Sequence, residues 1–99
     1  MRQFAFVLRP AIDQAFMEAA GPRELAVVEE HWQYLLELDR QVHLVVAGCC
    51  FDGPFAIVVF EAEDEAAAQA VVDADPSVAE GIQTAELYPF KIGLLRGGQ

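Results

Sequence analysis

The chain has 99 residues, a formal net charge of −10 and only six Lys and Arg residues. This length allows one domain with a single hydrophobic core, and the charge argues against nucleic acid and anionic membrane surfaces as partners, because both would repel the chain. Hydrophobic residues make up 55% of the sequence, and a chain this short buries such a share most easily by pairing with a second copy.

No segment has the pattern of a targeting or membrane-spanning sequence. The apolar run in MRQFAFVLRP is short and has no small-residue cleavage site after it. Nothing elsewhere approaches the roughly 18 consecutive apolar residues that a spanning helix needs. We therefore expect a cytoplasmic protein.

Two neighbouring cysteines, Cys49 and Cys50, are the whole cysteine content. Adjacent cysteines rarely bridge each other, because a disulfide would strain the peptide between them. They also lack the spaced partners of a metal site. We expect a reduced, buried pair and no metal.

The first half of the chain predicts a strand, a connection, a helix and a second strand. Residues 3–9 (QFAFVLR) have strand character, and residues 10–22 form a variable connection. Pro22 suits the first turn of a helix, whose pattern continues to about Arg40. Residues 42–51 (VHLVVAGCCF) are apolar and β-branched, as strands are.

A hairpin and a second helix come next. The sequence FDGP at residues 51–54 predicts a turn, which joins the preceding strand to a strand at residues 55–62 (FAIVVFEA). The acidic residues 63–65 suit the beginning of a helix, and Pro76 ends its pattern.

The last segment, IQTAELYPFKIGL, predicts a strand that is bent or broken at Pro89, followed by a flexible tail at residues 96–99. The order of elements is therefore β-α-β-β-α-β within a single domain, residues 1–99. This order predicts an α+β, ferredoxin-like βαββαβ fold, in which two helices cover one face of a four-stranded antiparallel sheet.

The middle strands predict a partner for the other face of this sheet. The sequences LVVAGCCF and FAIVVF hardly alternate between apolar and polar residues, which is typical of strands that are dry on both sides. Two helices cover only one side. We expect a homodimer by sheet-to-sheet packing; the alternative, in which the face is a wall of a ligand cavity, is compatible with a dimer.

The apolar residues of the first helix fall on two neighbouring stripes, at about 100° per residue. The stripe expected to face the core contains Leu25, Val28, Trp32, Leu35 and Leu36. The flanking stripe contains Val27, His31, Tyr34 and Leu38. His31 is therefore expected at the shoulder of the helix, where packing alone explains a histidine more often than chemistry does.

Asp75 lies at the exit of the second helix, in the sequence VVDADPSVAEG. An aspartate before a proline is typical of a helix cap, because the carboxylate accepts backbone N–H bonds while Pro76 occupies the first helical position. By residue type alone, capping is a sufficient explanation.

Four segments together resemble the YCII-related (YciI-like) family: EEHWQYL, VAGCCFDGPFAIVVFEAED, DADPSVAEGI and ELYPFK, in this order over residues 23–91. The resemblance implies a ferredoxin-like protomer of a dimeric α/β barrel. It also implies a candidate active site made by a histidine of the first helix and the aspartate of the DP pair, which match His31 and Asp75. The chain departs from the family in the connection at residues 10–22 and in the two cysteines after AG, where the family often has proline.

Such a pair has a definite chemistry. An imidazole titrates near neutrality and can take and return a proton, while a carboxylate bonded to its other nitrogen fixes the tautomer. His31 would be the acid/base and Asp75 its orienter, with no cofactor and no evident nucleophile. Arg9, Tyr34 and Ser77 are candidate substrate-binding residues. A surface ion pair explains Arg9 equally well, an interface contact explains Tyr34 at least as well, and helping the cap is the better explanation of Ser77.

Two functions follow from these observations. The first is a small cofactor-independent acid/base enzyme of lyase or hydrolase type. One relative in the family is implicated in dehydrochlorination of a chlorinated hydroxyquinol, so an aromatic or quinoid small molecule is the substrate implied by analogy. The second is a non-catalytic dimeric domain that binds a small ligand or regulates, in which the histidine and aspartate only make a structural hydrogen bond.

Overall fold

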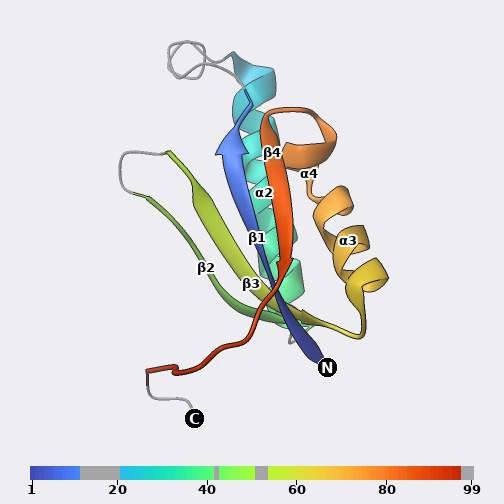
Figure 1. Cartoon of the computed structure of the whole chain (residues 1–99). Coiled ribbons are helices and arrows are strands. Elements are labelled where there is room, and N and C mark those ends of the chain that lie inside the picture. The colour runs from blue at the N-terminus through green and yellow to red at the C-terminus, as the bar shows by residue number, and fades with distance from the viewer. Residues whose placement is uncertain (12–20, 42, 51–53, 97–99) are drawn as a thin grey trace.

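The computed structural model describes residues 1–11, 21–41, 43–50 and 54–96. Most of the predicted connection and of the FDGP turn, and the end of the predicted tail, lie outside these residues. Within them the elements are β1 (Arg2–Pro10), α2 (Pro22–Arg40), β2 (Leu44–Cys49), β3 (Ala56–Ala62), α3 (Glu65–Ala74), α4 (Pro76–Ala79) and β4 (Gln83–Pro89), as Figure 1 shows.

The four strands form one antiparallel sheet in the order β2-β3-β1-β4. This order, with helical crossovers after β1 and β3, is the ferredoxin-like arrangement of an α+β fold, so the predicted fold is confirmed. In Figure 1 the long helix α2 passes behind the sheet. The one-turn helix α4 adds to the two predicted helices and occupies part of the segment SVAEG.

The hydrophobic core lies between the sheet and the helices. Alternate residues of the central strands point toward the helices and are fully buried: Phe4, Phe6, Leu8, Val58 and Phe60. The Phe60 ring packs against the rings of Phe4 and Phe6, with centroid separations of 6.1 and 5.6 Å. The helices contribute Leu35, Leu38, Ala68 and Val72 to the same cluster.

The opposite face of the sheet is apolar across its middle. Strand register places Ala5, Val7, Val46, Ile57, Val59 and Tyr88 on this face, which we call the open face. Of the described residues, no helix covers it. Val46 and Tyr88 are 49% and 46% exposed. The middle strands therefore carry apolar side chains on both faces of the sheet, as their weak alternation of apolar and polar residues predicts.

The predicted orientation of the first helix is wrong. Leu25, Trp32 and Leu36, which were assigned to the core, are 61%, 45% and 54% exposed. Leu35 is buried as expected, but the other buried residues, Val27, His31 and Leu38, belong to the flanking stripe. The helix is turned so that the stripe predicted to flank the core faces it, and His31 lies on the buried face and not on the shoulder.

Polar contacts of the second stripe explain this turn. The apolar arc of α2 is wider than the sheet can cover, so hydrophobicity alone leaves its rotation open. Tyr34 donates a hydrogen bond of 2.6 Å to the carbonyl of Val71 on α3, and His31 bonds Asp75. If the helix turned the other way, the fully buried Asp75 carboxylate would lose its imidazole partner, which is unfavourable.

The cysteine pair is only partly as predicted. Both thiols are free, but Cys49 is exposed and Cys50 is half-buried, so the prediction of a buried pair is wrong for Cys49. The cause is its place at the end of β2, an edge strand.

No helix among the described residues is long and apolar enough to cross a bilayer.

The orientation of α2 predicts different effects for two adjacent leucines. Leu35→Ala should lower the free energy of unfolding by about 2–5 kcal/mol, because it leaves a cavity in the core. Leu36→Ala should change it by less than about 0.5 kcal/mol, because this side chain is largely in solvent. Urea unfolding of both variants at one protein concentration measures the difference, and the reverse order would contradict the observed orientation.

The buried phenol of Tyr34 predicts an effect at alkaline pH. Burial, and secondly the negative charge of Asp75, raise the pKa of Tyr34 to about 12. Because this value exceeds that of an unfolded tyrosine, about 10, the contribution to stability is complete below pH ~10 and is lost as the pH rises toward ~12. In a Tyr88→Phe variant, which leaves one tyrosine, phenolate absorbance of the folded protein should rise near the higher value. A midpoint near that of the unfolded protein would contradict this environment.

Candidate active site

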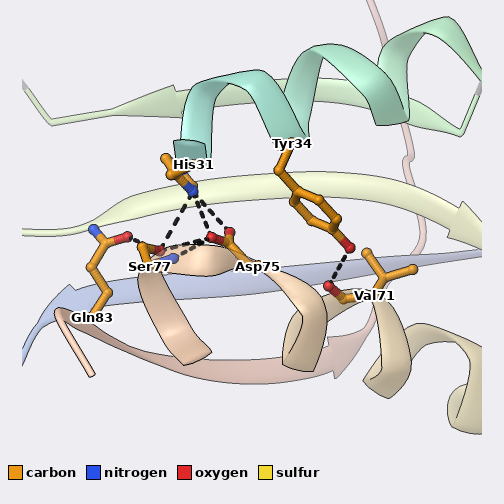
Figure 2. Close-up of polar contacts among 6 residues, drawn as sticks. All are labelled: His31, Tyr34, Val71, Asp75, Ser77 and Gln83. Carbon is orange, nitrogen blue, oxygen red and sulfur yellow. Dashed lines mark hydrogen bonds and ion pairs between the residues drawn. The ribbon is translucent and has the colours of Figure 1, made fainter. Parts of the chain in front are cut away.

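Two helices bring together a histidine and an aspartate that are 44 positions apart in the sequence. Nδ1 of His31, on α2, lies 2.8 Å from both carboxylate oxygens of Asp75, at the junction of α3 and α4 (Figure 2). His31 is 8% exposed and Asp75 is fully buried. The structure thus places side by side the two residues that the family resemblance paired.

Asp75 also caps a helix, as its residue type predicts. It has extended backbone angles between α3 and α4, and its Oδ1 accepts a 2.9 Å hydrogen bond from the backbone N–H of Ser77, with Pro76 in the first turn. Gly81 then lets the chain turn from α4 toward β4, because its φ of 74° is one that other residues rarely adopt. One carboxylate therefore both starts α4 and holds the imidazole.

The Asp75 carboxylate has donors enough to be buried as an anion. It is approached by His31 Nδ1, by the backbone N–H of Ser77, and by Ser77 Oγ at 2.9 Å. An unpaired buried carboxylate would be strongly destabilising. An ionised carboxylate only accepts, so Nδ1 of His31 must carry the hydrogen. In the neutral ring Nε2 then carries the lone pair, and no hydrogen bond joins it to another described residue.

A cavity of about 200 Å³ lies beside the imidazole. Its wall is mainly apolar, built from side chains of α2, β1, β2 and β3, and His31, Ser77 and Gln83 are its polar members apart from the Cys49 thiol. Trp32 also lines it, with its ring edge-on to the imidazole at a centroid separation of 5.5 Å. The histidine is therefore nearly desolvated but open to a small molecule.

Gln83, the first residue of β4, was not predicted as a site residue. Its Oε1 lies 2.8 Å from Ser77 Oγ, which places the amide at the cavity wall two contacts away from the imidazole (Figure 2). No sequence signal marks it, because a polar residue at the start of a strand is common.

Two of the proposed substrate-binding residues do not line this cavity. Arg9 is exposed and pairs with Glu86 at 3.7 Å, which is the surface ion pair considered as the alternative. The Tyr34 hydroxyl is engaged with Val71 between the helices. Ser77, by contrast, does line the cavity.

Within the part of the chain that the structure describes, no three His, Cys, Asp or Glu side chains come close enough together to hold a metal ion. What the site offers is one buried imidazole with a fixed tautomer, which suits proton transfer.

A solved structure shares this fold. The 5-chloro-2-hydroxyhydroquinone dehydrochlorinase from Burkholderia phenoliruptrix AC1100, in complex with 2,5-dihydroxybenzoquinone, superposes with a TM-score of 0.67 at 17% sequence identity. The match covers 91% of this chain and 95% of that one. At this identity the likeness establishes the fold. No curated protein matches the chain.

The family model for the YCII-related domain matches residues 6–91, nearly the whole chain. This range contains the helix that carries His31, the hairpin, the DADP segment and the final strand, which are the segments on which the resemblance was based. The chain belongs to the YCII-related domain family.

Proposed function

We propose that the protein is a small enzyme that needs no cofactor and uses His31 as a general acid/base on a small molecule in the adjoining cavity. The observation that carries this proposal is the Asp75 carboxylate at 2.8 Å from Nδ1 of a buried imidazole whose ring lines the cavity. Nε2 of the same ring makes no hydrogen bond to another described residue, which leaves it for a bound molecule.

The proton transfer follows from the tautomer. Nε2 takes a proton from a hydroxyl or an activated carbon of the substrate, and the imidazolium that forms is stabilised by the negative charge of Asp75. The same nitrogen then returns the proton to a second position or to a leaving group. Asp75 acts through His31 and not on the substrate, so it is a positioning residue.

A single aromatic or quinoid ring is the substrate that we propose. An apolar protein cavity of about 150 Å³ binds benzene, so a cavity of about 200 Å³ has room for one substituted ring. The similar fold of a dehydrochlorinase in complex with 2,5-dihydroxybenzoquinone supports this class. Loss of HCl from such a ring is a lyase reaction, and it needs the proton transfer that His31 can supply.

We also propose that the single domain, residues 1–99, works as a homodimer packed through the open face. Val46 and Tyr88, each about half exposed, and the neighbouring apolar side chains would then leave water. A mass in solution of twice the 10.9 kDa chain supports the dimer, and the chain mass alone would count against it. A cytoplasmic location stays a prediction from the sequence.

Substitution of His31 tests the catalytic role. His31→Gln keeps an N–H donor for Asp75 but carries no titrating proton, so the fold should survive. Release of chloride from 5-chloro-2-hydroxyhydroquinone, used as a probe, should fall about 100-fold to 10,000-fold. Thermal unfolding should show only a small change, whereas His31→Ala would leave a buried carboxylate without its main partner and destabilise the protein by about 3–5 kcal/mol.

The second histidine provides the matched control. His43 lies outside the cavity lining, so His43→Gln should leave chloride release close to that of the unsubstituted protein. Equal activity of the His31→Gln variant would exclude His31 as the acid/base. Binding of the probe without any chloride release by the unsubstituted protein would instead favour the non-catalytic ligand-binding domain.

A further inference from the structure

The Ser77 hydroxyl lies between two acceptors but has one proton. Its Oγ is 2.9 Å from Asp75 Oδ1 and 2.8 Å from Gln83 Oε1, so both contacts have hydrogen-bond length. A hydroxyl donates once. One of the two contacts must therefore be made in some other way.

Asp75 is the preferred acceptor for the hydroxyl proton of Ser77. A hydrogen bond to a carboxylate is roughly twice as strong as one between neutral groups, and Ser77 Oγ otherwise sits without a proton against a buried anion. A half-turn of the Gln83 amide about its last bond would resolve the conflict, because it exchanges oxygen and nitrogen with almost no change of shape. Nε2 then donates to Ser77 Oγ, and Oε1 turns away from it.

Two polar groups of the cavity wall, from His31 and Gln83, would then both be hydrogen-bond acceptors. In its neutral form His31 offers the Nε2 lone pair, because Nδ1 carries the hydrogen that bonds Asp75. Gln83 also lines the cavity, and with its amide reversed its carbonyl oxygen would face away from Ser77 Oγ. Both groups are acceptors, both line the cavity, and both contact Ser77, with His31 Nδ1 at 3.4 Å from Oγ.

We propose that the cavity selects a single aromatic ring that carries at least two hydroxyl groups, and that Gln83 determines this specificity. One hydroxyl donates to His31 Nε2, the second donates to Gln83 Oε1, and the ring occupies the apolar remainder. This inference rests on the proposed function, whose site it extends by one residue. A ring that carries no hydroxyl donor leaves both His31 Nε2 and Gln83 Oε1 buried without a hydrogen bond. This weakens the binding of such a ring.

The single tryptophan of the chain provides the signal for a binding test. Because Trp32 lines the cavity, its indole N–H resonance should shift on titration with a ligand. The probes are catechol and hydroquinone, each compared with its monofluoro analogue, 2-fluorophenol or 4-fluorophenol, in which fluorine replaces one hydroxyl at nearly the same size.

In the unsubstituted protein we expect at least one diol to bind more tightly than its fluoro analogue. Gln83→Met, which keeps the length of the side chain and removes the amide, should reduce this preference by about threefold to tenfold, the range of one hydrogen bond between neutral groups. Thr84→Val is the matched control: its side chain belongs to the next residue of β4, is exposed, and points to the open face, so the preference should not change.

Equal binding of both diols and their fluoro analogues to the unsubstituted protein would overturn the inference, as would an unchanged preference in Gln83→Met. A measurement without any variant keeps the inference testable if that variant does not fold. A nuclear Overhauser effect from the Gln83 side-chain NH2 to the Ser77 β protons is expected, and its absence would mean that the amide oxygen faces Ser77.

Failure of this inference and failure of the proposed function are distinguishable. If His31→Gln abolishes chloride release while Gln83→Met leaves the diol preference unchanged, the enzyme stands and the role of Gln83 falls. If the diol preference depends on Gln83 but the unsubstituted protein releases no chloride, the specificity stands and the proposed reaction falls.

Discussion

The hydrogen bond between the His31 imidazole and the Asp75 carboxylate is the interaction on which the arrangement of the helices and the site depends. It joins α2 to the junction of α3 and α4, and both groups are buried. This hydrogen bond selects which of the two apolar stripes of α2 faces the core, a choice that hydrophobicity alone leaves open. The same carboxylate starts α4 by accepting the Ser77 N–H. Removing either group would leave the other one buried without its hydrogen-bond partner, which is destabilising.

This bond links stability and chemistry in one pair of residues. Burial of a charged carboxylate is unfavourable unless its donors are complete, and the structure completes them with the imidazole, a backbone N–H and a hydroxyl. The consequence for the imidazole is a fixed tautomer with one nitrogen left for the cavity. A contact that stabilises the fold would therefore also prepare His31 for the proposed acid/base role, so a structural and a positioning role of Asp75 are compatible.

The sequence predicts the strands, the two main helices and the ferredoxin-like order, because apolar spacing and the Pro signals at Pro22 and Pro76 are local. It does not predict the rotation of α2, since hydrophobicity favours two adjacent stripes and the decision comes from tertiary polar contacts of His31 and Tyr34. Residue types alone favoured packing for His31 and capping for Asp75, and only the family resemblance paired them. Gln83 lies at the site because the fold places the first residue of β4 beside Ser77, and no local sequence pattern predicts this position.

The tautomer of His31 is the property that tests this account most directly. Nitrogen-15 NMR of the imidazole distinguishes a protonated from an unprotonated ring nitrogen, and the second histidine, His43, can be removed by His43→Gln to simplify the spectrum. In the neutral ring we predict hydrogen on Nδ1, an unprotonated Nε2, and a change at Nε2 when hydroquinone or catechol is added. Hydrogen on Nε2 in the neutral ring, together with an imidazole signal indifferent to both ligands, would contradict the account.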